Sequence, residues 1–278
     1  MKKILQQLPI SLLCLTLSAC TLVTATNEHT DSTANRQNST ATDANLTGYE
    51  LPMIKDKKNK SLIIKHKGFT LSFNCQTLCP DWVAWCLTKE EATTKKVERT
   101  NYFQADTQVP SNCRVEYYDY SKSGYDRGHM VPAADMRWDK QAMEDCFLMS
   151  NMCPQHHDLN EGDWNSLEMA CRRWAKAEGA IYIACGPIFE EDRQPDRIGR
   201  KRIAVPDHFF KVVMTLTPGH ERAIGFIFQN TTGVQFMKDC AVSVDEVEKI
   251  TGYDFFASVP RELQERIEAQ ADFKEWNN

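Results

Sequence analysis

The most constraining feature of this sequence is a long helical pattern that leads directly into a buried strand. Large apolar side chains recur every three or four residues between residues 158 and 178, which gathers them on one face of a helix. Gly179 then occupies a position where glycine commonly ends a helix. Residues 180–186 form a short apolar run of the kind found in strands buried on both faces. The sequence therefore predicts one long amphipathic helix followed at once by a central strand.

The other secondary-structure signals lie on both sides of this helix in the sequence. Two β-like runs flank a Lys67-Gly68 turn within residues 62–73. Further strands are expected at residues 81–87, 208–216 and 223–229. Further helices are expected at residues 244–251, which a capping box opens, and at residues 261–271. Strands grouped before and after a central helix indicate an α+β fold with a mixed or antiparallel central sheet and flanking helices.

Residues 1–19 are typical of an export signal. Two lysines precede an apolar run that is much shorter than the ~20 residues needed to span a bilayer. Residues 17–20, Leu-Ser-Ala-Cys, resemble a bacterial lipobox, which implies cleavage before Cys20 and attachment of lipid to it. A plain secretory peptide cut near Ala19 or Ala25 is the alternative. We expect an exported protein that is lipid-anchored to the bacterial cell envelope and faces the periplasm or the outer surface.

Composition divides the rest of the chain into two parts. Residues 20–47 consist mostly of Thr, Asn, Ala, Ser and Asp, so they bury too little apolar surface to fold and should form a flexible tether. No repeat or second linker follows, and residues 48–278 are expected to form one domain. The net charge of −5 argues against a nucleic-acid binder that relies on overall basic charge, although it leaves a local basic groove open.

The cysteines are numerous for a chain of this kind. Of eleven, Cys14 leaves with the signal and Cys20 takes the lipid, so nine remain. Export favours disulfides among them, and because nine is odd, at least one thiol stays free or pairs with another molecule. The alternative is a zinc site at Cys75, Cys79 and Cys86, which lacks a second close pair of ligands.

The residues that indicate chemistry lie between positions 120 and 173. His129 follows Arg127 and Gly128, and a histidine in a glycine turn beside an arginine suits a general base acting next to an anion. On the predicted helix, Asn160 and Glu168 are offset by about 80°, so both can face one cleft. Arg172 follows Glu168 by one turn.

Oxygen ligands near a helix start, a histidine and two arginines fit metal-assisted phosphoryl chemistry with a hard cation such as Mg²⁺. Taken singly, each residue also has a structural explanation. A histidine can be packed, an asparagine can cap a helix, and a surface Glu–Arg pair is a weak salt bridge of ~0.3–0.5 kcal/mol. Their joint spacing favours the functional interpretation.

These motifs resemble the DNA/RNA non-specific endonuclease family, the ββα-metal (His-Me finger) group that includes endonuclease G. The resemblance rests on Asp126-Arg-Gly-His129, Ser150-Asn151 with Pro154-Gln155, Asn160 and Glu168, and it extends from about residue 61 to residue 258. It implies a ββα-metal active-site motif within the α+β fold.

The resemblance also implies a role for each site residue. His129 is the general base that activates water, Asn160 is the direct ligand of Mg²⁺ (or Mn²⁺), and Glu168 holds that ion through a water. Arg127 and Arg172 stabilise charge on the transition state, and Asn151 supports the site by hydrogen bonding. Arg99 resembles a further phosphate-contacting arginine.

DNA and RNA are the implied substrates, cut without sequence specificity to 5′-phosphate ends, because contacts to phosphate carry no base information. Some relatives dimerise, which leaves a homodimer open. The basic segment 193–202 is either part of the groove or a solubilising loop. The lysines between residues 55 and 67 are expected to form a solvated edge.

Three alternatives remain open. A non-catalytic nucleic-acid-binding lipoprotein and a phosphodiesterase for small nucleotides both use the same scaffold. A zinc-dependent hydrolase would use His129, His156 and His157.

Overall fold

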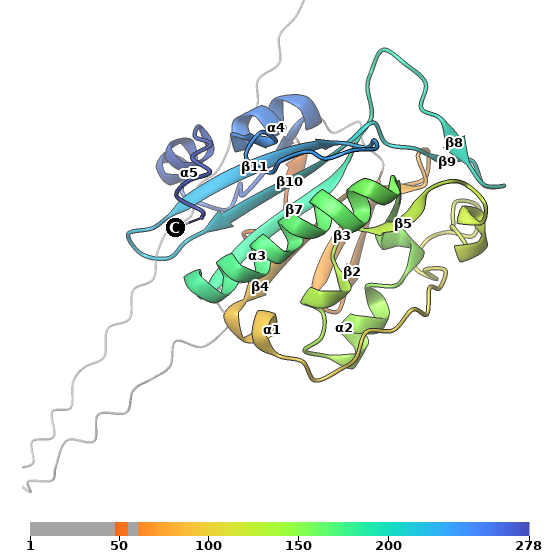
Figure 1. The fold of residues 1–278 in the computed structure, drawn as a ribbon, viewed down its shortest axis with the longest axis horizontal. Coiled ribbons are helices and arrows are strands. Elements are labelled where there is room, and N and C mark those ends of the chain that lie inside the picture. The colour runs from red at the N-terminus through yellow and green to blue at the C-terminus, as the bar shows by residue number, and fades with distance from the viewer. Residues whose placement is uncertain (1–47, 55–60, 278) are drawn as a thin grey trace, which may run out of the picture. The chain divides into compact units, whose positions relative to one another are not determined.

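A seven-stranded antiparallel sheet forms the centre of the computed structural model (Figure 1). The structure describes residues 48–54 and 61–277. The strand order is β12-β11-β10-β7-β4-β3-β2. The strands are β2 (Leu62–His66), β3 (Phe69–Asn74), β4 (Cys79–Thr88), β7 (Ala180–Ile188), β10 (His208–Thr215), β11 (Arg222–Gln229) and β12 (Ala241–Val242). Every strand expected from the sequence is present.

Among the described residues, three two-stranded ribbons and five α-helices complete the fold. The ribbons pair β1 (Met53–Ile54) with β13 (Tyr253–Asp254), β5 (Asp126–His129) with β6 (Met152–Gln155), and β8 (Arg197–Ile198) with β9 (Ile203–Ala204). The helices are α1 (Lys89–Thr93), α2 (Lys140–Asp145), α3 (Asn165–Glu178), α4 (Val244–Thr251) and α5 (Arg261–Glu268). Short 3₁₀ helices lie at η2 (Tyr117–Tyr120), η3 (Ala133–Asp135) and η4 (Met149–Asn151), and a π-helix, η5 (Leu159–Trp164), precedes α3.

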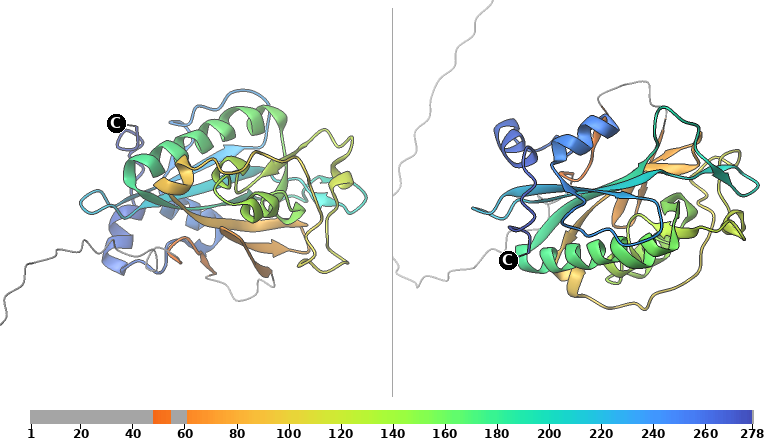
Figure 2. Two further views of the ribbon diagram at one scale, coloured as in Figure 1. Left: turned by 90° about the horizontal axis from the view of Figure 1, so that it is seen from below. Right: turned by 45° about the horizontal axis from the view of Figure 1, so that its top comes forward.

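Helices cover both faces of the sheet, with α3 on one face and α4 and α5 on the other (Figure 2). The central strand β7 faces both layers: Ile183 lies in the core beneath α3, whereas Tyr182 and Ala184 lie in the core beneath α4 and α5. Burial on both faces explains the continuous apolar run that predicted this strand. The α+β prediction is therefore confirmed.

Two differences from the sequence-based expectations concern the ends of helices. Residues 159–164 of the predicted long helix form the π-helix η5, and the α-helix α3 begins at Asn165. The last helix ends at Glu268 instead of residue 271. Within the described residues, no helix combines the length and the apolar character needed to cross a bilayer.

One disulfide, Cys75–Cys113, is formed among the described residues, and seven cysteines there are free. Because Cys75 is bonded to Cys113, the alternative of a zinc site at Cys75, Cys79 and Cys86 is wrong. The predicted export signal, the lipidated Cys20, the tether at 20–47 and the lysines at 55, 57, 58 and 60 lie outside the described residues.

Candidate active site

Two short strands and the long helix form one continuous ββα unit. The antiparallel pair β5–β6 is followed directly by η5 and α3. In this pair Gly128 lies opposite Cys153, and a Cβ atom at Gly128 would overlap the side chain of Gln155. Glycine at this position therefore lets the Gln155 side chain lie against β5, and the turn expected here from the sequence is a strand instead.

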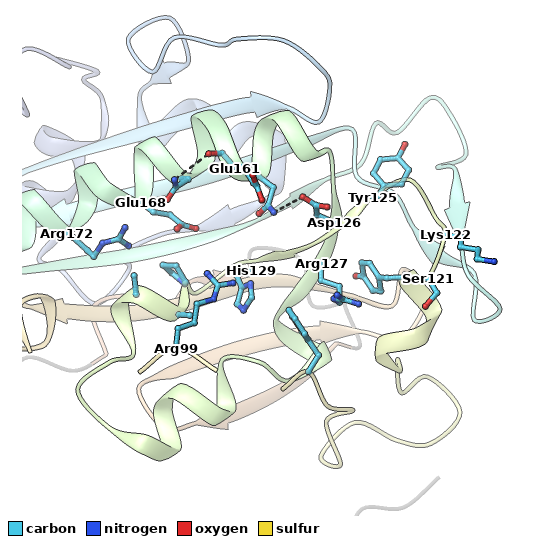
Figure 3. Close-up of a pocket in the computed structure, with 17 residues that line it drawn as sticks. Arg99, Ser121, Lys122, Tyr125, Asp126, Arg127, His129, Glu161, Glu168 and Arg172 are labelled. Atoms are coloured by element: carbon cyan, nitrogen blue, oxygen red, sulfur yellow. Dashed lines mark hydrogen bonds between the residues drawn. The ribbon is translucent and has the colours of Figure 1, made fainter. Parts of the chain in front are cut away.

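The unit borders a pocket of about 700 Å³. All the predicted site residues except Asn151 line this pocket, namely Arg99, Arg127, His129, Asn160, Glu168 and Arg172. Figure 3 shows His129 between Arg99 and Arg127, with Glu168 and Arg172 on the helix above them. The fold thus brings together side chains from the loop before β5, from β5 itself and from the helix.

His129 is a neutral histidine with an unpaired nitrogen. Its side chain lies against Phe103 and Phe147, with ring centroids 5.6 and 4.8 Å away. Burial, followed by the charges of Arg99 and Arg127, lowers the pKa of His129 to about 3, and a hydrogen bond with the Arg127 backbone opposes this only in part. Nε2 has no hydrogen-bond partner among the described residues. A neutral imidazole with an unsatisfied nitrogen at a polar pocket is chemically suited to accept a proton.

Asn160 lies on the π-helical turn, with its amide held in one orientation. Its Nδ2 donates to Asp126 Oδ2 at 3.0 Å, and the same oxygen lies 2.9 Å from His157 Nδ1. This contact leaves Asn160 Oδ1 available as a ligand. The 80° offset from Glu168 assumed a regular α-helix, and that assumption is wrong for this turn. Both side chains nevertheless line the pocket.

The carboxyl group of Glu168 lies in a buried environment beside two positively charged side chains. Burial raises its pKa to about 7, while the positive charges of Lys211 and Arg172 act in the opposite direction. Lys211 is itself only 1% exposed and lies with Nζ 4.4 Å from the ring centroid of Trp164. The carboxylate of Glu168 and the amide oxygen of Asn160 are hard oxygen donors, so the pocket fits a hard divalent cation better than zinc.

Other groups that could bind a metal lie elsewhere. In the described chain, the one cluster of His, Cys, Asp or Glu side chains with suitable spacing is Asp245, Glu248 and Glu268, and none of them lines the pocket. His156 packs near the ring of Tyr125, and His157 pairs with Asp126. The fold therefore does not assemble the three histidines of the zinc-hydrolase alternative into a ligand set within the described residues.

The arginines of the pocket fall into two kinds. Arg172 Nη1 forms a salt bridge with Asp135 Oδ1 at 2.9 Å, and no ion pair joins Arg172 to Glu168 among the described residues. The surface Glu–Arg pair considered from sequence is therefore absent from the part of the chain that is described. Arg99 and Arg127 instead lie over aromatic rings and form no ion pair with a described carboxylate, so their charges remain available to an anion.

Asn151 is fully buried outside the pocket and braces the backbone that follows β5. Its Nδ2 donates to the carbonyl oxygens of Val131 and Cys146 at 3.0 and 2.8 Å, and its Oδ1 accepts from the N–H of Val131 at 3.0 Å. The segment leaving His129 is thereby tied to the segment preceding β6. This position is consistent with a supporting residue.

Several functional neighbours did not emerge from the sequence. Asp126 belongs to the Asp126–His129 motif, but the sequence predicted no role for it. Three further residues, Asp135, Phe103 and Lys211, contact site residues only through tertiary packing. Lys211 left a usable signal, because a lysine in the middle of the apolar run 208–216 must be buried with a partner.

Three basic side chains of the segment 193–202 form hydrogen bonds with the rest of the fold. Arg193 pairs with Asp207, Arg197 donates to the carbonyl oxygens of Gln76 and Arg202, and Lys201 donates to that of Ser111. Arg197 thus secures the β8–β9 ribbon, whereas Arg193, Arg200 and Arg202 are exposed.

Comparisons with known proteins identify nucleases as relatives of this chain. Residues 52–262 match the family model for DNA/RNA non-specific endonuclease. The mitochondrial nuclease of Saccharomyces cerevisiae is 32% identical over 234 residues, covering 76% of this chain and 71% of the yeast protein. A nuclease of Nostoc sp. is 33% identical over 222 residues, covering 76% and 78% of the two chains.

A crystal structure of the EndoG/EndoGI complex shares the fold, with a TM-score of 0.68 at 29% identity over 74% of this chain and 89% of that chain. The structural match covers the ββα-metal nuclease fold. This chain therefore belongs to the DNA/RNA non-specific endonuclease family of metal-dependent nucleases.

Proposed function

We propose that the protein is an Mg²⁺-dependent endonuclease that hydrolyses phosphodiester bonds in both DNA and RNA and leaves 5′-phosphate ends. The observation that carries this proposal is the pocket itself. A neutral His129 with an unpaired nitrogen shares the pocket with Glu168 and with Asn160, whose amide is oriented by Asp126. Membership of a nuclease family supplies the substrate class.

The residues of the chain divide the reaction among them. His129 takes a proton from the water that attacks phosphorus. As the bond between phosphorus and the water oxygen forms, the bond between phosphorus and the 3′-oxygen breaks and the 3′-oxygen leaves. Arg127 and Arg99 carry unpaired positive charge beside His129 and stabilise the negative charge that gathers on the phosphate oxygens. Arg172 is already paired with Asp135, so less of its positive charge is available to the phosphate. Its main effect is to hold α3 against the segment that carries Asp135.

Asn160 Oδ1 would hold the divalent cation directly, and Glu168 would hold it through a water. When bound, such a cation supplies Lewis-acid stabilisation of the charge on the phosphate. Asp126 accepts a hydrogen bond from Asn160 Nδ2 and so orients the amide with Asn160 Oδ1 available to the cation. Because these groups address phosphate and not bases, cleavage is expected to ignore sequence and the sugar.

The test uses purified full-length protein with supercoiled plasmid and, separately, single-stranded RNA. Cleavage of both substrates with Mg²⁺, loss of cleavage in EDTA, and products that a 5′-phosphate-dependent exonuclease degrades would support the proposal. Intact polymers together with hydrolysis of a mononucleotide ester would instead favour the small-nucleotide phosphodiesterase. Binding without hydrolysis of either class would contradict the catalytic assignment.

A further inference from the structure

Two large aromatic side chains stand exposed beside the pocket. Tyr117 and Tyr118 are 52% and 51% exposed, and their rings meet edge to face with centroids 5.5 Å apart. They open the short helix η2, whose last residue, Tyr120, lines the pocket together with Ser121 and Lys122. Adjacent exposed tyrosines on the segment that leads into the pocket wall leave apolar ring surface in water unless a ligand covers it.

The tyrosine pair is linked directly to the arginine assigned to phosphate. The carbonyl oxygen of Tyr117 accepts a hydrogen bond from Arg127 Nη1 at 3.5 Å. The Arg127 guanidinium also lies 4.4 Å from the ring centroid of Phe103, so its position is defined from two sides. A phosphate bound at Arg127 therefore places the neighbouring nucleotide close to η2.

The support beneath the tyrosines is fixed to the rest of the fold. Cys113, just before η2, is bonded to Cys75, and Lys201 Nζ donates to the carbonyl oxygen of Ser111 at 3.3 Å. Gly199 of the β8–β9 ribbon packs so closely on Asp119 that a Cβ atom there would overlap the Asp119 carbonyl oxygen. The rings are thus presented on a preorganised element, which lowers the entropy lost on binding.

We propose that Tyr117 and Tyr118 form a base-stacking platform for an unpaired nucleobase of the nucleic-acid strand next to the scissile phosphate. This inference rests on the proposed function and extends it to a preference for single-stranded or locally unpaired substrate. Stacking on aromatic rings is tolerant of base identity, so the platform adds strand preference without adding sequence preference. In a duplex the bases already stack on one another and do not reach the rings.

The experiment measures binding and cleavage separately. Binding of a fluorescein-labelled single-stranded deoxyoligonucleotide is followed by anisotropy in EDTA, where no hydrolysis occurs. The same strand with abasic sites throughout and the matching duplex serve as comparison ligands. The full-length protein is compared with the Tyr117→Ala/Tyr118→Ala and Tyr117→Phe/Tyr118→Phe double variants. Ile250→Ala, which removes an exposed apolar side chain on α4, is the control.

We expect the alanine pair to weaken single-strand binding about tenfold, with changes below twofold for the duplex and the abasic strand. The phenylalanine pair, which keeps both ring faces, should bind like the unaltered protein. The unaltered protein should itself bind the abasic strand about tenfold more weakly than the normal strand, a comparison that does not depend on how any variant folds.

Equal binding of the normal and abasic strands by the unaltered protein would overturn the platform. An alanine pair that weakens all three ligands alike would also overturn it. Failure of the proposed function looks different: the unaltered protein would bind the strands in EDTA but fail to cleave any of them when Mg²⁺ replaces EDTA.

Discussion

His129 and Glu168 have pKa values displaced in opposite directions within one pocket. The pKa of His129 falls to about 3, chiefly through burial, so the imidazole is neutral at any pH at which the protein would act. The pKa of Glu168 rises to about 7, also chiefly through burial, so this carboxyl group changes charge near neutrality. We therefore expect Glu168, and not the general base, to limit activity on the acid side.

We accordingly expect the rate at limiting Mg²⁺ to rise with pH across about 6–8, as Glu168 loses its proton. A cation near the carboxylate favours its ionised form, so raising the Mg²⁺ concentration should move this rise to lower pH. Initial rates of plasmid nicking at a series of pH values and Mg²⁺ concentrations test the expectation. A rise that stays at one pH whatever the Mg²⁺ concentration would show that another group limits the reaction.

Asp126 orients the metal ligand, and its removal should act through metal affinity. In Asp126→Ala the Asn160 amide loses the acceptor of its Nδ2, so we expect the Mg²⁺ concentration for half-maximal rate to rise about tenfold or more. Saturating Mg²⁺ should restore much of the rate. Asp192→Ala, at an exposed position in the loop before β8, is the matched control. An unchanged Mg²⁺ requirement in Asp126→Ala would remove this role.

For individual residues, the sequence predicts those that share a local motif and misses those that come into contact only in the folded chain. His129, Arg127 and Asn151 occur in short motifs, and Asn160 and Glu168 follow from the family resemblance, because the regular helical spacing assumed for them does not hold at Asn160. Asp135 reaches Arg172 across 37 positions, and no local pattern announces such a contact.

Among the elements, α5 carries a buried carboxyl group whose charge opposes folding. Glu268 is 3% exposed, and its carboxylate lies within 4.8 Å of those of Asp245 and Glu248 on α4. Burial, followed by the charge of Glu248, raises its pKa to about 9. The folded state raises the pKa of Glu268 above its ordinary value near 4.5. The contribution of Glu268 to the free energy of unfolding is therefore fully present below pH 4.5 and is lost as the pH rises towards 9.

Replacing Glu268 with Gln keeps the side chain neutral at every pH. The variant should match the unaltered protein near pH 5 and melt at a higher temperature at pH 8, by about 2–4 °C for each kcal/mol of destabilisation removed. Glu262→Gln, on the exposed side of the same helix, controls for a general charge effect. Thermal unfolding of both variants and the unaltered protein at the two pH values tests this prediction. A lower melting temperature of Glu268→Gln than of the unaltered protein at pH 8 would contradict a destabilising charge at Glu268.

The elements also show where sequence patterns succeed and where they fail. The strand β7 was predictable because burial on both faces leaves a continuous apolar run. The π-helical turn of η5 was not, because side-chain periodicity reports which face is apolar and not which carbonyl each N–H bonds to. The short ribbon β8–β9 was not predicted, because Arg197 bonds to backbone oxygens and a basic segment of this kind resembles a solvated loop in the sequence.

For the whole molecule, the N-terminal segment predicts an anchored enzyme. We propose that the protein is exported and held in the bacterial envelope by lipid on Cys20, so that the catalytic domain acts outside the cytoplasm. Metabolic labelling with a radioactive fatty acid should label the unaltered protein and leave Cys20→Ser unlabelled. Absence of label from both proteins would favour a plain secretory signal, whereas label retained in Cys20→Ser would mean that lipid is attached at another residue.

The central claim concerns the whole catalytic arrangement and depends on His129. We would measure cleavage of supercoiled plasmid and single-stranded RNA by His129→Ala with Mg²⁺, beside His220→Ala, which removes an exposed histidine of the β10–β11 turn. The account predicts that His129→Ala loses at least about a hundredfold in rate on both substrates. It should unfold at a similar temperature, while His220→Ala keeps full activity. A folded His129→Ala that cleaves either substrate at the unaltered rate would contradict the account.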